Sequence, residues 1–127
     1  MKDNVNSPQH YTQASITLEP IDVLRYAPFD LGNALKYIIR AGHKGDELED
    51  LLKALKYIGW AEETCSQTFF KCQYEDFITN YGLFVKKFKA VSNIKTNYGA
   101  NGFIEDLKIL INKRIEEWYE KNHLKTE

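Results

Sequence analysis

The spacing of apolar residues along this chain predicts an all-helical protein. Apolar positions recur every three or four residues, and no pair of alternating strands with turn signals appears. Helices are predicted over about residues 19–27, 31–42, 69–91 and 102–122, with a further helix that begins at Asp46. The apolar stripes of the four longer helices are Leu31, Leu35, Ile38 and Ile39; Leu48, Leu51, Leu52, Leu55 and Ile58; Phe70, Tyr74, Phe77, Ile78, Tyr81, Phe84, Val85 and Phe88; and Phe103, Leu107, Leu110, Ile111, Ile115 and Trp118. We therefore expect a compact bundle or array of about five helices in a single domain, preceded by an extended polar lead-in over residues 1–18.

Polar residues and glycines mark the predicted ends of these helices. Asp30 is predicted to cap the second helix, and Asp46 with Glu49 three residues later forms a capping-box-like pair at the start of the third. The segment Gly42–Gly45 predicts a short turn between them, so the second and third helices should pack antiparallel or at a steep angle. The run 92–102 is rich in asparagine and glycine and predicts a loop.

Composition and charge narrow the classes of function. A formal net charge of −1 argues against a protein held to extended nucleic acid by a large positive field, but it leaves room for a local cationic pocket. No apolar run approaches the roughly 20 residues of a membrane span, and the polar N-terminus has no signal-peptide core. Cys65 and Cys72 are too few for a disulfide scaffold, and their spacing does not suit a metal, so we expect free thiols in a reducing cytosol.

The second predicted helix separates apolar from cationic residues. Opposite its leucines lie Asn33, Lys36, Tyr37, Arg40 and, if the helix extends that far, Lys44. Three cations at this spacing repel one another, and an anion held between them would reverse the sign of that effect. Arginine and lysine suit phosphate, and the neighbouring tyrosine could support a base or a sugar. The alternative is an ordinary solvated helix face.

The third predicted helix adds carboxylates beside these cations. Asp50, Lys53 and Tyr57 should line a polar face opposite the leucines. Asp50 could orient Lys53, hold Mg²⁺ with bound phosphates, or accept a proton, and the alternative is a salt-bridged surface. His10 and Tyr11 fall in the polar lead-in, where a histidine is usually a surface residue.

Familiar catalytic motifs are absent from the sequence. It contains no GxxxxGK[ST], no GxGxxG after a strand, no HExxH and no zinc-spaced Cys/His cluster. A kinase on this scaffold would therefore be unusual, although phosphoryl transfer needs mainly positioning and charge neutralisation. The carboxylates at 47–50 and 62–63 offer a loose match to an all-helical nucleotide pyrophosphatase, which the facing cationic helix disfavours.

Four blocks of sequence carry a family resemblance. DNVNSPQHY at 3–11, EPIDV at 19–23, LGNALKYIIRAGHKG at 31–45 and EDLLKALKYI at 49–58 resemble a small phage family that is labelled phage nucleotide kinase or SaV-like. The resemblance covers about residues 3–62 and does not extend to the second half. It implies a phage protein of the host cytoplasm, a homo-oligomer, and a nucleoside monophosphate kinase that transfers phosphate from ATP, with Mg²⁺, to a deoxynucleoside monophosphate.

The matching polar positions supply the candidate site. The candidate catalytic residues are His10, Lys36, Arg40 and Asp50, and the candidate nucleotide-binding residues are Tyr11, Asn33, Lys36, Tyr37, Arg40, Lys44 and Lys53. No residue is assigned as a metal ligand. Mg²⁺ could be carried by the nucleotide and lie near Asp50. Two alternatives stay open: a nucleotide-binding protein without chemistry, and an interaction protein that disables a host enzyme. The aromatic surface of that interaction protein would comprise Tyr74, Phe77, Tyr81, Phe84, Phe88 and Trp118, for which a core or a homo-oligomer seam is the favoured interpretation.

Overall fold

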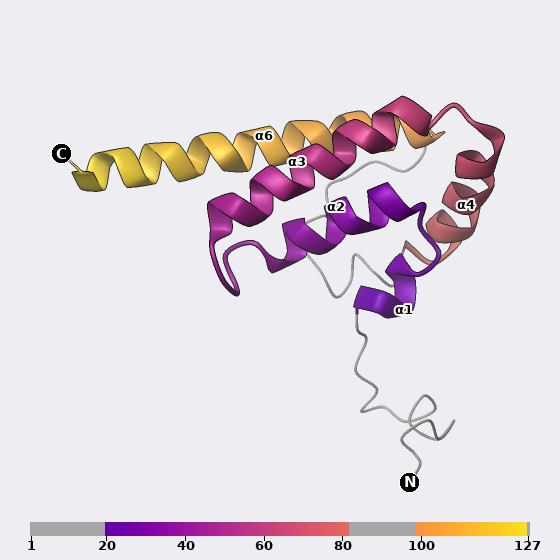
Figure 1. The fold of residues 1–127 in the computed structure, drawn as a ribbon, viewed down its shortest axis with the longest axis horizontal. Helices are drawn as coiled ribbons and strands as arrows, with labels where there is room; N and C mark the ends of the chain where they lie inside the picture. Colours follow the sequence, from indigo (N-terminus) through magenta and orange to yellow (C-terminus); the bar gives the residue numbers. More distant parts are fainter. Residues whose placement is uncertain (1–19, 82–98, 127) are drawn as a thin grey trace, which may run out of the picture.

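The computed structural model describes residues 20–81 and 99–126 (Figure 1). Its helices are α1 (Pro20–Leu24), α2 (Phe29–Arg40), α3 (Glu47–Thr64), α4 (Thr68–Thr79) and α6 (Gly99–Thr126), and no strand occurs within the described ranges. The predicted all-helical class is confirmed. The predicted lead-in over residues 1–18 lies outside the described residues.

Helix α3 is the central element of the molecule. It packs against α2 after the short turn at residues 41–46, and against α6 along another side. Figure 1 shows α6 running alongside α3, with its C-terminal end extending past α3, while α4 lies at the opposite end. The buried residues of α3 therefore serve contacts with two neighbouring helices.

This position of α3 changes which of its residues form the core. The buried residues of α3 are Asp50, Leu51, Ala54, Ile58 and Ala61. Leu52 was predicted in the apolar stripe, but it is 46% exposed. The prediction was wrong there because the covered sector is centred on the alanines, whose small side chains allow neighbouring helices to approach closely. On α2, the predicted Leu31, Leu35 and Ile38 are all fully buried.

An aromatic cluster closes the end of the core near α4. Tyr74, Phe77 and Tyr81 pack around Phe103 of α6 with ring centroids 5.7, 5.8 and 5.2 Å from its ring. All four are buried, and the contacts are edge-to-face, the geometry that aromatic rings prefer. These rings therefore belong to the core and cannot supply the host-binding surface considered above; Phe84 and Phe88 lie outside the described residues.

Two helix starts show how local chemistry sets the boundaries. Asp46 caps α3 as predicted, because its carboxylate accepts a hydrogen bond from the Glu49 backbone N–H at 3.1 Å. Asp30 is not the cap of α2, so that prediction was wrong. The helix starts two residues earlier than expected, with extended Pro28 (φ −53°, ψ 145°) before Phe29, and Asp30 lies in the first turn, where its charge favours the helix dipole.

Of the helix predicted within residues 69–91, the structure describes the part up to residue 81, and residues 82–91 lie outside the described residues. Helix α4 ends at Thr79, and Asn80 donates through its side chain to the Asp76 carbonyl at 3.1 Å. Thr79 likewise donates to the Glu75 carbonyl at 2.9 Å, and such side-chain bonds compete with continuation of the helix. The last helix begins at Gly99, within the predicted loop, where a φ of +75° suits glycine.

Candidate functional site

Side chains of α2 and α3 form a surface of cations and aromatic rings, in which Tyr37 and Tyr57 are half-buried. The Tyr37 and Tyr57 rings stack with centroids 5.9 Å apart and planes 14° from parallel. Two ammonium groups lie near one of these rings: the Lys36 Nζ is 4.9 Å and the Lys53 Nζ 5.5 Å from the Tyr37 centroid. The predicted binding residues Lys36, Tyr37 and Lys53 are thus brought together.

The aromatic surface extends beyond this pair toward the start of α2. Tyr57 meets Phe29 edge-on at 6.3 Å and Trp60 at 5.4 Å, and the Lys56 Nζ lies 5.4 Å from the Trp60 centroid. Phe29 is 73% exposed and Trp60 43% exposed. Sequence reasoning missed Phe29, Lys56 and Trp60, although Lys56 and Trp60 stand four residues apart, the spacing of neighbours on a helix.

We call this surface the cation–aromatic face. It comprises Phe29, Lys36, Tyr37, Lys53, Lys56, Tyr57 and Trp60. The charge of the face changes from positive to negative beside Phe29 and Trp60, where the carboxyl groups of Asp30 and Glu63 are close enough to interact. Burial, and secondarily the negative charge of Glu63, raises the pKa of Asp30 above its ordinary value.

Arg40 and Asp50 form an ion pair where α2 and α3 approach each other beside the turn. The Arg40 Nε lies 3.4 Å from the Asp50 Oδ2; the Asp50 side chain is 3% exposed and the Arg40 side chain 48%. Asp50 was predicted on a polar face opposite the leucines, and that placement was wrong, because the buried sector of α3 includes it. The candidate partner of Asp50 was Lys53, but the structure pairs it with Arg40.

The glycine turn passes close to this ion pair. Gly45 has a φ of +74°, and a Cβ placed there would lie 3.3 Å from the Arg40 Nη2. Glycine is thus favoured twice at this position, by the backbone conformation and by the space that the guanidinium takes.

Arg114 of α6 holds the same turn from the other side. Its guanidinium donates to the Ile38 and Ala41 carbonyls at 3.2 Å each, and to the Glu47 carboxylate at 3.3 Å. These carbonyls belong to the end of α2, where a helix has no further N–H groups to offer them. Sequence reasoning missed Arg114, because nothing in its local pattern indicates acceptors 67 to 76 residues away.

Other candidate residues do not join these contacts. The Asn33 amide donates to the Phe29 carbonyl at 2.9 Å within α2, and Lys44 is exposed in the turn. A hollow of about 350 Å³ lies on α3, and its lining includes Lys53 and Lys56 of the cation–aromatic face but neither Lys36 nor Arg40. His10 and Tyr11 lie outside the described residues.

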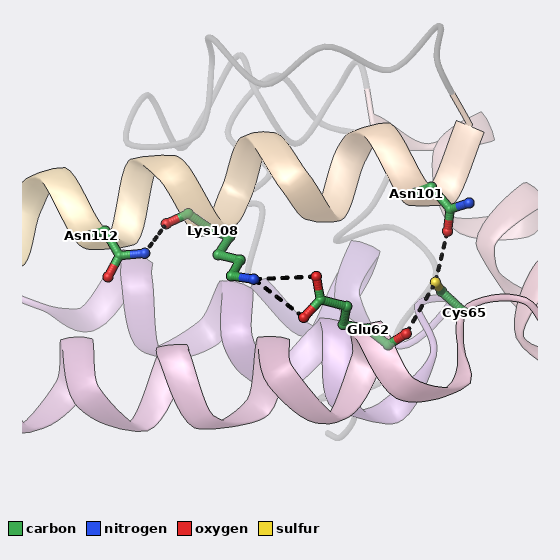
Figure 2. A network of polar contacts seen from close by, with 5 residues as sticks. All are labelled: Glu62, Cys65, Asn101, Lys108 and Asn112. Atoms are coloured by element: carbon green, nitrogen blue, oxygen red, sulfur yellow. Dashed lines mark hydrogen bonds and ion pairs between the residues drawn. The ribbon is translucent and has the colours of Figure 1, made fainter.

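Glu62, one of the carboxylates considered for a pyrophosphatase, forms an ion pair at the contact between α3 and α6. The Lys108 Nζ donates to both Glu62 oxygens at 3.3 Å, and the Cys65 thiol donates to the Asn101 side-chain oxygen at 2.7 Å (Figure 2). Cys65 is buried, Cys72 is exposed, and both are free thiols. Within residues 20–81 and 99–126, no group of three His, Cys, Asp or Glu side chains is arranged to hold a metal ion.

The geometry does not favour Asp50 as a ligand for Mg²⁺. Its carboxylate is buried and faces a guanidinium, whereas Mg²⁺ is usually bound by exposed carboxylates that leave room for several waters. The arrangement instead suits orientation of Arg40. In the part of the chain that the structure describes, no helix has the length and apolar character needed to cross a membrane.

Comparison with known proteins gives one match. Residues 5–59 are similar to a family described as a protein of unknown function, DUF3310. The matched stretch is less than half of the chain; it includes α2 and most of α3, ends just before Trp60, and leaves out α4 and α6. No curated protein and no solved structure matches.

Proposed function

We propose that the cation–aromatic face binds a nucleotide. The observation that carries this proposal is the Tyr37 ring, which stacks on Tyr57 and has the ammonium groups of both Lys36 and Lys53 within 5.5 Å of its centroid. A nucleotide combines a flat π-system with negative phosphates, and this face combines rings with cations. Arg40 lies next to Tyr37 at the end of α2 and would extend the cationic region.

Physical chemistry explains why an anion fits here. The two lysine ammonium groups beside the Tyr37 ring repel each other. A cation–π contact at an exposed site stabilises each of them by only about 0.5–1 kcal/mol. A phosphate between the lysines would turn that repulsion into attraction. The exposed rings of Phe29 and Trp60 could accept a base, since stacking of a base on an aromatic side chain contributes about 1–3 kcal/mol.

We propose that the reaction served by this site is transfer of a phosphoryl group from ATP to a deoxynucleoside monophosphate. Support comes from the resemblance of residues 3–62 to the phage nucleotide kinase family, and from the lysines and Arg40, which suit charge neutralisation during phosphoryl transfer. The same resemblance supports a phage protein that works in the host cytoplasm as a homo-oligomer. Exposed Ile109 and Tyr119 on α6 are consistent with self-association, which light scattering would measure.

Calorimetric titration with ATP, dTMP and dGMP tests the binding proposal. The double variant Lys36→Ala, Lys53→Ala should weaken nucleotide affinity about tenfold or more, because two charge-assisted contacts are lost. Lys71→Ala is the matched control: it removes an exposed lysine on α4, away from the face, and should leave affinity unchanged.

A coupled assay of ATP consumption with dTMP and Mg²⁺ tests the reaction. Turnover that falls in the double variant and not in Lys71→Ala supports a kinase. Nucleotide binding without turnover rejects the kinase and leaves a non-catalytic nucleotide-binding protein. If the unmodified chain binds none of the nucleotides, the proposal is wrong as a whole.

A further inference from the structure

The ion pair at the α2–α3 turn has an unusual asymmetry. Asp50 is 2% exposed, and among the described residues no group donates a hydrogen bond to its Oδ2, whose ion-pair contact is the Arg40 Nε at 3.4 Å. A buried carboxylate is costly unless it is paired and fully hydrogen-bonded, and apolar residues of the same size often serve stability as well. The acid is therefore poorly explained by stability alone.

We infer that Asp50 is a positioning residue that holds Arg40 in one orientation for the phosphate of a bound nucleotide. The guanidinium touches Asp50 through Nε and lies against the Gly45 backbone on the side of Nη2, while 48% of the side chain is exposed. Arginine has five N–H donors, so contact with Asp50 through Nε leaves others for an anion. This inference rests on the proposed nucleotide site and adds the residue that orders its arginine.

A second ion pair on α3 shows what a purely structural contact looks like. Glu62 and Lys108 meet at 3.3 Å, and their side chains are 46% and 39% exposed, so both partners are solvated alike (Figure 2). In the Asp50–Arg40 pair the acid is fixed inside the protein and the base reaches solvent. A rigid acid with an outward base is the arrangement that preorganises an arginine, because less of its side-chain freedom remains to be lost when an anion binds.

The test compares a phosphorylated with an unphosphorylated ligand. In Asp50→Asn, which keeps the shape of the side chain and removes its charge, affinity for ATP should fall about tenfold while affinity for adenosine is unchanged. Glu62→Gln is the matched control, since it removes an acid from the Glu62–Lys108 ion pair, also on α3, and should alter neither affinity. The Arg40 Nε–Hε signal in NMR should show a mobile side chain in Asp50→Asn and an ordered one in the unmodified protein.

A second variant perturbs Arg40 without removing a charge. Gly45→Ala leaves every charge in place but puts a methyl group 3.3 Å from the Arg40 Nη2, so it should also weaken ATP binding and spare adenosine. Equal loss of both ligands would show a merely structural role and overturn the inference. Unchanged ATP affinity in both variants would overturn the inference and leave the proposed function intact, whereas an unmodified chain that binds no ATP rejects both.

Discussion

Arg114 offers the sharpest test of how the second half of the chain supports the first. Arg114→Ala removes three hydrogen bonds at once, two to the Ile38 and Ala41 carbonyls and one to the Glu47 carboxylate. The arginine side chain is 22% exposed, so water replaces these bonds only in part. Hydrogen bonds that involve a charged group contribute about 1.5–3 kcal/mol each, and such values do not add fully within one network. We expect the free energy of unfolding to fall by about 2–4 kcal/mol.

Urea unfolding followed by circular dichroism measures this loss. The slope with denaturant should stay the same, because the folded state remains equally compact. Lys108→Ala is the control on the same helix: its ion pair with Glu62 is exposed at both ends and should contribute less than about 1 kcal/mol. If Arg114→Ala costs no more than Lys108→Ala, then α6 does not hold the end of α2 as we have argued.

Three further changes test the core and the helix ends. Phe77→Ala, at a fully buried ring, should lower the free energy of unfolding by about 3–5 kcal/mol, and a loss of less than half that value would contradict the packing described here. Asp46→Ala should cost about 1 kcal/mol through loss of the α3 cap, and Asp46→Asn should restore most of it. Burial raises the pKa of Tyr74 from 10.0 to about 12, so above pH 10 this side chain ionises first in the unfolded chain. The contribution of Tyr74 to the free energy of unfolding should be constant below pH 10 and fall between pH 10 and 12. Tyr74→Phe should flatten that decline in urea titrations, and an unchanged slope would refute the assignment.

The buried face of a helix could be predicted from sequence where its large apolar residues are also its buried residues. The stripe of Leu31, Leu35 and Ile38 predicts the right buried face for α2, because its large apolar side chains are also the ones that pack into the core. The same reasoning failed for Leu52, since α3 has neighbours on two sides and its buried sector is turned toward Ala54 and Ala61. A wheel identifies an apolar stripe, but the width and direction of the covered sector depend on tertiary neighbours.

The cationic residues of the site were predictable for the same reason that α2 was. Lys36 and Arg40 had to lie away from the leucines, and Tyr37 beside them could be read from spacing alone. The contacts of Tyr37 and Arg40 could not be predicted from sequence, because they depend on how α3 packs against α2. The stack of Tyr37 on Tyr57 and the pairing of Arg40 with Asp50 each join residues of two helices.

Asp50 is the position where local pattern and tertiary structure disagree most. By composition an aspartate belongs on the solvated side of α3, yet packing places it among buried residues with one incompletely bonded oxygen. Natural sequences are consistent across levels nearly everywhere, and conflicts of this kind concentrate at functional positions. The partner of Asp50 sharpens that argument, because Arg40 was selected independently, from its charge and its place on the wheel. If the buried Asp50 orders the exposed Arg40, both the burial of the acid and the position of the arginine are explained. A chance ion pair at the surface would require neither the burial of Asp50 nor a glycine at position 45.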